Sequence, residues 1–184
     1  MKSITSLKST MRRMAVAGAL SAAALAAHAD GTAPKAVLSG YTDGVAGASL
    51  MAGDYRAVID QLGAHGLSYA SDELSASTNL CVAYIMTRQW TAAHAVCDEA
   101  IRIARLEPHD SLLFAWKMHD FNVALAYSNR AVLDWLEARR ERTASDLAHA
   151  QALSPDAQFV TQNTVALATA DSASTATAAV ASAR

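Results

Sequence analysis

The residues best suited to chemistry are two adjacent pairs, His109–Asp110 and His119–Asp120. Imidazole and carboxylate groups ligate metals, but ten residues separate the two histidines and no third ligand stands out nearby. The chain has no glycine-rich phosphate loop, no Gly-x-Ser-x-Gly nucleophile motif and no His-Glu-x-x-His motif. We therefore expect no enzyme, no cofactor and no metal site, and a histidine-based metal protein or enzyme is the weakest of the functions considered.

The two cysteines, Cys81 and Cys97, stand at equal distances from Gln89, where we expect a turn between two helices. Residues equidistant from such a turn lie at the same height on an antiparallel helix pair. A disulfide between them would close a short loop and stabilise the fold by about 3 kcal/mol. The alternative is two reduced cysteines that fill small positions in the core. Their spacing fits no common zinc or redox motif.

The segment from Met1 to Ala29 has the pattern of a secretory signal peptide. Basic residues come first, an apolar stretch follows over 14–27, and Ala27-His28-Ala29 places small residues where a signal peptidase cuts. A membrane anchor is the alternative, but the apolar stretch is shorter than the roughly 20 residues of a spanning helix. We expect cleavage after Ala29 and a periplasmic or secreted location. The four basic residues of this segment are Lys2, Lys8, Arg12 and Arg13.

Without the signal peptide, the chain has 11 basic and 17 acidic residues, a formal charge of −6. A mildly acidic chain with no basic run does not favour binding to nucleic acid or to anionic membranes. No other segment is long and apolar enough to insert stably into a bilayer. The remaining partners are a protein, a peptide or a second copy of the chain.

Periodicity predicts an all-α fold. Apolar residues recur at three- and four-residue spacing from Ser71 to Leu153, and the chain has only three prolines. Glycines at 40, 44 and 47 weaken any helix before that stretch, so we expect residues 30–45 to be a flexible N-terminal segment. The Ala-, Ser- and Thr-rich tail, 169–184, has no pattern that could bury a face, and we expect it to be disordered.

Three segments begin with asparagine followed by small or apolar residues, at Asn79, Asn129 and Asn163. The spacing between the second and third asparagines matches the period of the tetratricopeptide repeat, which is about 34 residues. The spacing between the first and second asparagines is longer, and it equals one such period plus an insert.

Over residues 46–168 the chain resembles the tetratricopeptide repeat family. With Asn79 at the sixth repeat position, small and aromatic residues fall where the family has them, at Cys81, Tyr84, Trp90, Ala93 and Ala100. The second repeat matches at Ala131, Leu147, Ala150 and Pro155, and departs at Asp134 and Thr143. A third unit has only its first, capping helix. The segment from Gly53 to Val58 resembles the turn and second-helix start of an earlier, degenerate unit. The resemblance implies about two and a half stacked helix pairs.

Such repeats present a concave groove that binds an extended peptide or a partner helix. By resemblance, its first-helix positions here are Asn79, Val82, Met86, Asn129, Val132, Trp135 and Asn163. An asparagine amide offers a donor and an acceptor to a peptide backbone. The same amides could instead bond to neighbouring helices and hold the stack together.

The insert, residues 108–120, is too apolar for a solvated loop. It either extends the helix that contains Asn129 into one long rod or forms a separate helix. Its apolar side chains either add to the core or form a binding patch.

The leading expectation is an exported scaffold that mediates protein–protein interaction in the bacterial envelope. The alternative is a structural accessory that forms a homodimer through Trp116 of the insert.

Overall fold

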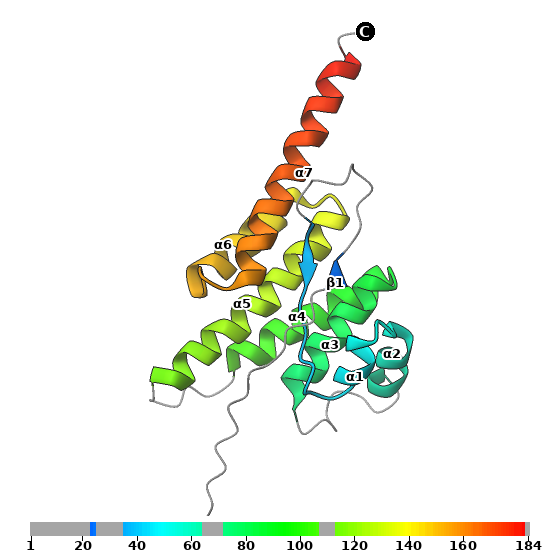
Figure 1. The fold of residues 1–184 in the computed structure, drawn as a ribbon, viewed down its shortest axis with the longest axis vertical. Helices are drawn as coiled ribbons and strands as arrows, with labels where there is room; N and C mark the ends of the chain where they lie inside the picture. Colours follow the sequence, from blue (N-terminus) through cyan, green and yellow to red (C-terminus); the bar gives the residue numbers. More distant parts are fainter. Residues whose placement is uncertain (1–22, 25–34, 64–71, 107–112, 183–184) are drawn as a thin grey trace, which may run out of the picture.

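The structure, a computed structural model, describes residues 23–24, 35–63, 72–106 and 113–182. These residues form an all-α fold with one two-residue strand pair (Figure 1). The expected signal peptide and its cleavage site lie outside the described residues, except for Ala23 and Ala24. Among the described helices, none combines the length and the apolar character that crossing a bilayer requires.

The first six helices form three hairpins along the chain. Their bounds are α1 Gly47–Met51 with α2 Tyr55–Gly63, α3 Glu73–Met86 with α4 Trp90–Leu106, and α5 Leu113–Leu136 with α6 Arg140–Leu153. The two helices of each hairpin pack together, α2 packs on α3, and α4 packs on α5. A last helix, α7 (Gln158–Ser182), contacts α5 and α6 and so covers the end of the series.

One turn geometry joins the helices in all three hairpins. Gly53, Arg88 and Ala138 have positive φ angles of 71°, 58° and 59°. At each turn, the N–H of the residue with positive φ donates to the carbonyl oxygen of the residue three positions earlier. The N–H of the next residue donates to the carbonyl oxygen five positions before it. This is the Schellman arrangement, which pairs the last carbonyls of a helix. The expected turn at Gly53 and the helix start that follows it are therefore confirmed, and a short helix, α1, precedes the turn.

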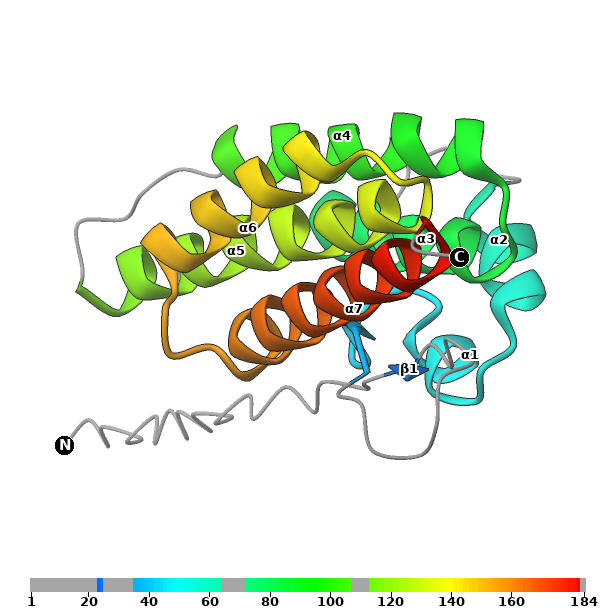
Figure 2. The same cartoon turned by 90° about the horizontal axis from the view of Figure 1, so that it is seen from above.

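The short strand β2 (Val37–Leu38) contacts α5 and α7 on the side away from α4 and α6 (Figure 2). It pairs antiparallel with β1 (Ala23–Ala24), with Ala23 opposite Leu38. The surrounding residues 36–40 are buried. The expectation of a flexible segment over 30–45 is therefore wrong for residues 36–41, because their side chains and backbone groups have partners on the helices.

Two further expectations concern the insert and the tail. Residues 113–120 belong to α5, so of the two alternatives for the insert the structure contains the longer rod that includes Asn129. The helix α7 continues to Ser182 and extends past the other helices (Figure 1), so the expected disorder of 169–184 is wrong for 169–182. Alanine has the highest helix propensity, and a helix already nucleated on α5 and α6 can propagate through an alanine-rich stretch.

Candidate functional site

The three repeat-register asparagines face one element, the N-terminal arm, which we define as residues 36–41. Asn79 lies on α3, Asn129 on α5 and Asn163 on α7, and each side chain is at most 1% exposed. These helices lie beside one another under the arm, so the three amides form a row along it (Figures 1 and 2). We call this row the asparagine ladder.

Each asparagine binds one residue of the arm through both backbone groups. Val37 N donates to Asn163 Oδ1 at 2.7 Å, and Asn163 Nδ2 donates to Val37 O at 2.9 Å. Ser39 makes the same pair with Asn129, at 2.9 and 2.7 Å. Tyr41 makes it with Asn79, at 2.7 and 2.8 Å. The ladder therefore holds six main-chain hydrogen bonds.

The chemistry of the ladder is that of a neighbouring strand. In an extended chain, the N–H and C=O of alternate residues point to the same edge, which explains why residues 37, 39 and 41 are bound. A carboxamide places a donor and an acceptor side by side and so matches the N–H and C=O of one residue. If the Oδ1 and Nδ2 atoms of an asparagine were exchanged, Nδ2 would face the N–H of the arm and Oδ1 would face the C=O. The backbone groups of the arm therefore fix the orientation of each side-chain amide.

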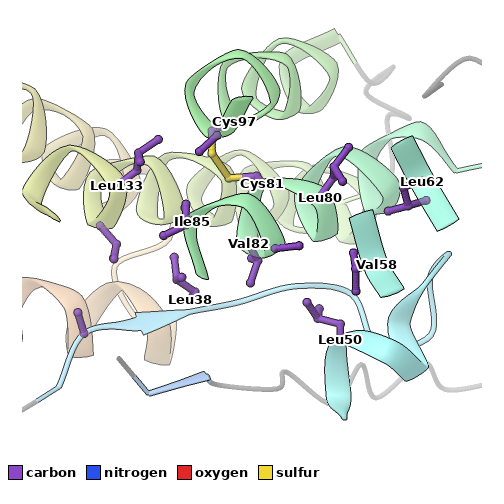
Figure 3. Close-up of a cluster of buried hydrophobic side chains, with 14 of the residues drawn as sticks. Leu38, Leu50, Val58, Leu62, Leu80, Cys81, Val82, Ile85, Cys97 and Leu133 are labelled. Carbon is purple, nitrogen blue, oxygen red and sulfur yellow. A yellow bond between two sulfur atoms is a disulfide. The ribbon is translucent and has the colours of Figure 1, made fainter. Parts of the chain in front are cut away.

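The side chains of the arm add apolar contacts on both flanks. Leu38 is fully buried and packs in one cluster with Val82 and Ile85 of α3 (Figure 3). Val37 joins a second cluster, which contains Val123 of α5 and Val160 of α7. Val37 and Leu38 pack in different clusters because neighbouring side chains of an extended chain point in opposite directions.

Gly40 and Tyr41 fix the end of the arm nearest α3. A Cβ built on Gly40 would lie 2.5 Å from Leu50 Cδ2 and 2.6 Å from Asn79 Oδ1, so only glycine allows this approach. The Tyr41 hydroxyl donates to Asn122 Oδ1 at 2.7 Å. Asn79 Nδ2 also donates to Val45 O at 3.0 Å, which connects the ladder to the turn before α1.

The other positions expected to line a groove are not on an open surface. Val82 and Val132 are at most 2% exposed and belong to the core. Met86 and Trp135 are partly buried against the same cluster. The Trp135 indole donates to Asp171 Oδ1 at 3.1 Å, and the Arg140 guanidinium lies 5.4 Å from the ring centroid. A partner could reach the ladder only by replacing the arm.

The asparagines combine the two roles considered from sequence alone, but the backbone that they pair with belongs to this chain. Their main partner is the chain's own arm, although Asn163 also donates to Ser128 Oγ of the neighbouring helix at 2.9 Å. Sequence reasoning missed the arm because the glycines at 40, 44 and 47 suggested a flexible segment. The available signal was the run Ala36-Val37-Leu38, which is too apolar for a solvated linker.

A Cys81–Cys97 disulfide joins α3 to α4, with a Cα–Cα distance of 4.9 Å (Figure 3). Both cysteines are at most 1% exposed. Of the two alternatives that the sequence allowed, the structure contains the bridge. It fixes the hairpin whose first helix carries Asn79 and Val82, and so supports one end of the ladder.

An ion-pair network joins the second and third hairpins. The Arg130 guanidinium binds both carboxylate oxygens of Asp146 at 2.7 and 2.8 Å, and Asp98 at 2.7 Å. These charge-assisted bonds raise the pKa of Arg130, with the Asp146 bond as the main cause. One side chain of α5 therefore binds α4 and α6 together, next to Asn129.

A second charged cluster lies near the α5–α6 turn. His94 of α4 contacts Glu137, and Asp134 is fully buried 3.2 Å from Arg142 Nε. Burial raises the pKa of Asp134, and Arg142 only partly offsets this effect.

The described residues contain no group of three or more His, Cys, Asp or Glu side chains arranged to hold an ion. His119 Nδ1 lies 3.3 Å from Asp120 Oδ1. His109 and Asp110 lie outside the described residues.

The fold and the site together define an all-helical protein that holds its own extended N-terminal arm through a row of buried amides. No family model, curated protein or solved structure matches the chain.

Proposed function

We propose that this protein is an exported scaffold of the tetratricopeptide type that mediates protein–protein interaction in the bacterial envelope. The observation that carries the proposal is the asparagine ladder, with its six hydrogen bonds to the backbone of an extended segment. Amides with this spacing suit the recognition of an extended polypeptide, because they pair with its main-chain groups and leave its side chains to give selectivity.

Features of the repeat register, the turns and the disulfide agree with this function. The spacing of Asn129 and Asn163 matches the period of the family, and all three hairpins share one turn geometry. The Cys81–Cys97 disulfide is compatible with an oxidising compartment such as the periplasm. Cleavage after Ala29 would release the chain from its leader and leave the arm close to the new N-terminus.

The test is affinity capture from an envelope fraction, followed by rebinding of the purified partner. The Trp135→Ala variant removes a side chain that packs against the same core cluster as Leu38 of the arm, and we expect it to lose at least tenfold in affinity for the partner. Arg102→Ala is the matched control, because this side chain is 55% exposed on α4, away from the arm. Equal rebinding to wild type and Trp135→Ala, with both proteins folded, would count against the ladder face as the binding site.

A self-associating accessory is the second candidate, and one observation favours it. Trp116 and Met118, in the first part of α5, are 54% and 43% exposed. Large apolar side chains exposed together are typical of interfaces. A dimer of micromolar affinity in analytical ultracentrifugation, lost in Trp116→Ala, would support this candidate, and a monomer at all concentrations would exclude it.

A further inference from the structure

The N-terminal arm occupies the place that a bound peptide would take, and its bonds to the ladder are independent of side chains. All six ladder bonds use backbone N–H and C=O groups of Val37, Ser39 and Tyr41. Any extended chain of L-residues presents the same groups at the same spacing. The ladder therefore selects an extended backbone, and it does not distinguish the arm from another strand.

Two positions of the arm restrict the side chain most strictly. Leu38 is 0% exposed among the aliphatic residues of α3, so this position requires an aliphatic side chain of similar size. Gly40 has no room for a Cβ against Leu50 and Asn79. The arm thus defines a recognition pattern: an aliphatic residue, any small residue and a glycine.

The arm is also a segment that can leave without unwinding a helix. It precedes α1 in the chain, and its outer edge pairs with β1 at Ala23–Ala24. Cleavage after Ala29, expected from the sequence, would remove β1 and leave the arm connected to the domain only through residues 42–46. An empty ladder is unfavourable because three buried amides would lose their partners, so departure of the arm must be coupled to arrival of another strand.

We propose that the arm is a built-in ligand of the asparagine ladder, and that the ladder accepts in its place an extended segment of a partner protein with the same aliphatic-x-Gly pattern. This inference rests on the proposed scaffold function and names the chemistry of its partner. The arm is connected to its site and acts at a high effective concentration, so a competing segment binds the wild-type protein weakly. A change that weakens the arm and leaves the ladder intact opens the site.

The experiment uses the full chain purified from the envelope after export, with a fluorescent synthetic peptide of residues 34–43 as the probe. Gly40→Ala in the protein weakens the arm, and anisotropy should show at least tenfold tighter peptide binding than for wild type. Gly63→Ala is the matched control, because the nearest atoms to its Cβ lie at 3.9 and 4.0 Å, and it should bind like wild type. A peptide that carries alanine in place of Gly40 should bind at least tenfold more weakly.

A folded Gly40→Ala protein that binds the peptide no better than wild type would overturn the proposal. If this variant does not fold, amide hydrogen exchange of the wild type decides. The amides of Val37 and Ser39 should exchange through local opening, before those of Leu125 and Val132 in α5. Exchange of the arm only together with α5 would make it a permanent part of the core and overturn the proposal. Peptide binding without any envelope partner would instead refute the scaffold function alone.

Discussion

Asn129 and Ser39 lie 90 residues apart in the sequence and exchange two hydrogen bonds, from Ser39 N to Asn129 Oδ1 at 2.9 Å and from Asn129 Nδ2 to Ser39 O at 2.7 Å. Both residues are at most 2% exposed. This pair is the central rung of the ladder, between the rungs at Asn79 and Asn163. Its loss should affect the whole arm.

We expect Asn129→Asp to destabilise the protein strongly. The new carboxylate keeps an acceptor for Ser39 N but places a second oxygen against Ser39 O, and it buries a charge. The free energy of unfolding should fall by about 2–4 kcal/mol. Urea unfolding followed by circular dichroism measures this change. Gln162→Glu makes the same chemical change on an exposed residue one position before Asn163, and should stay within about 0.5 kcal/mol of wild type. Equal stabilities of the two variants would contradict the ladder.

The turn between α5 and α6 offers a stabilising change. Ala138 is exposed and has a φ of 59°, a region that is unfavourable for residues with a Cβ. Ala138→Gly should therefore raise the free energy of unfolding by about 0.5–1 kcal/mol. The same substitution at exposed Ala148, inside α6, should lower it by about 1 kcal/mol. A loss of stability in both variants would show that Ala138 is not in the left-handed conformation.

Reduction of the Cys81–Cys97 disulfide should destabilise the chain without a change of fold. The bridge closes a loop with a sequence separation of 16, and such a loop corresponds to about 3 kcal/mol of unfolding free energy. Urea unfolding with and without a reductant measures the difference. In the double variant Cys81→Ala/Cys97→Ala, the reductant should have no effect. A wild-type transition that does not move on reduction, with thiol titration confirming the reduced state, would be inconsistent with a stabilising bridge.

The stability should depend on pH through Asp134. Burial raises the pKa of this carboxyl, so folding favours its protonated form. A raised folded-state pKa contributes stability below the unfolded pKa, and the contribution is lost as the pH rises through the folded value. Asp134→Asn should therefore be more stable than wild type at pH 7, with a smaller difference at pH 3. A difference that grows toward acid pH would reverse the assignment.

The network around Arg130 predicts a large difference between two substitutions. Arg130→Ala leaves Asp146, which is 5% exposed, without its bidentate partner, and should cost about 2–4 kcal/mol of unfolding free energy. Glu99→Ala removes the partner of the exposed Arg102 on α4 and should change stability by less than about 1 kcal/mol. Thermal and urea unfolding of both variants provide the comparison. Similar losses would mean that the Arg130 network does not join the hairpins as described.

Local patterns in the sequence were enough to predict the helices between 73 and 153, the hairpin at Gln89 and the closeness of the two cysteines, while the choice between a disulfide and two thiols stayed open. Cys81 and Cys97 could be paired because two antiparallel helices around one short turn leave a single register. The sequence did not decide the structure of the insert, since an apolar stretch as short as 108–120 fits either a separate helix or the start of a longer one. The tail was predicted poorly, because the absence of an apolar face does not prevent an alanine-rich helix from continuing.

The sequence by itself determined the all-helical fold, the spacing of the three asparagines and the closeness of the two cysteines, all of which follow from local periodicity. Only the tertiary structure decided what the asparagines bind. Val37 and Asn163 are separated by 126 residues, and nothing in the local pattern of either segment specifies the other. The donor and acceptor of an asparagine amide can bond equally well to a neighbouring helix, a partner peptide or an extended segment of the same chain. The arrangement of α3, α5 and α7 selects among these, because it places three amides at the spacing of one extended strand.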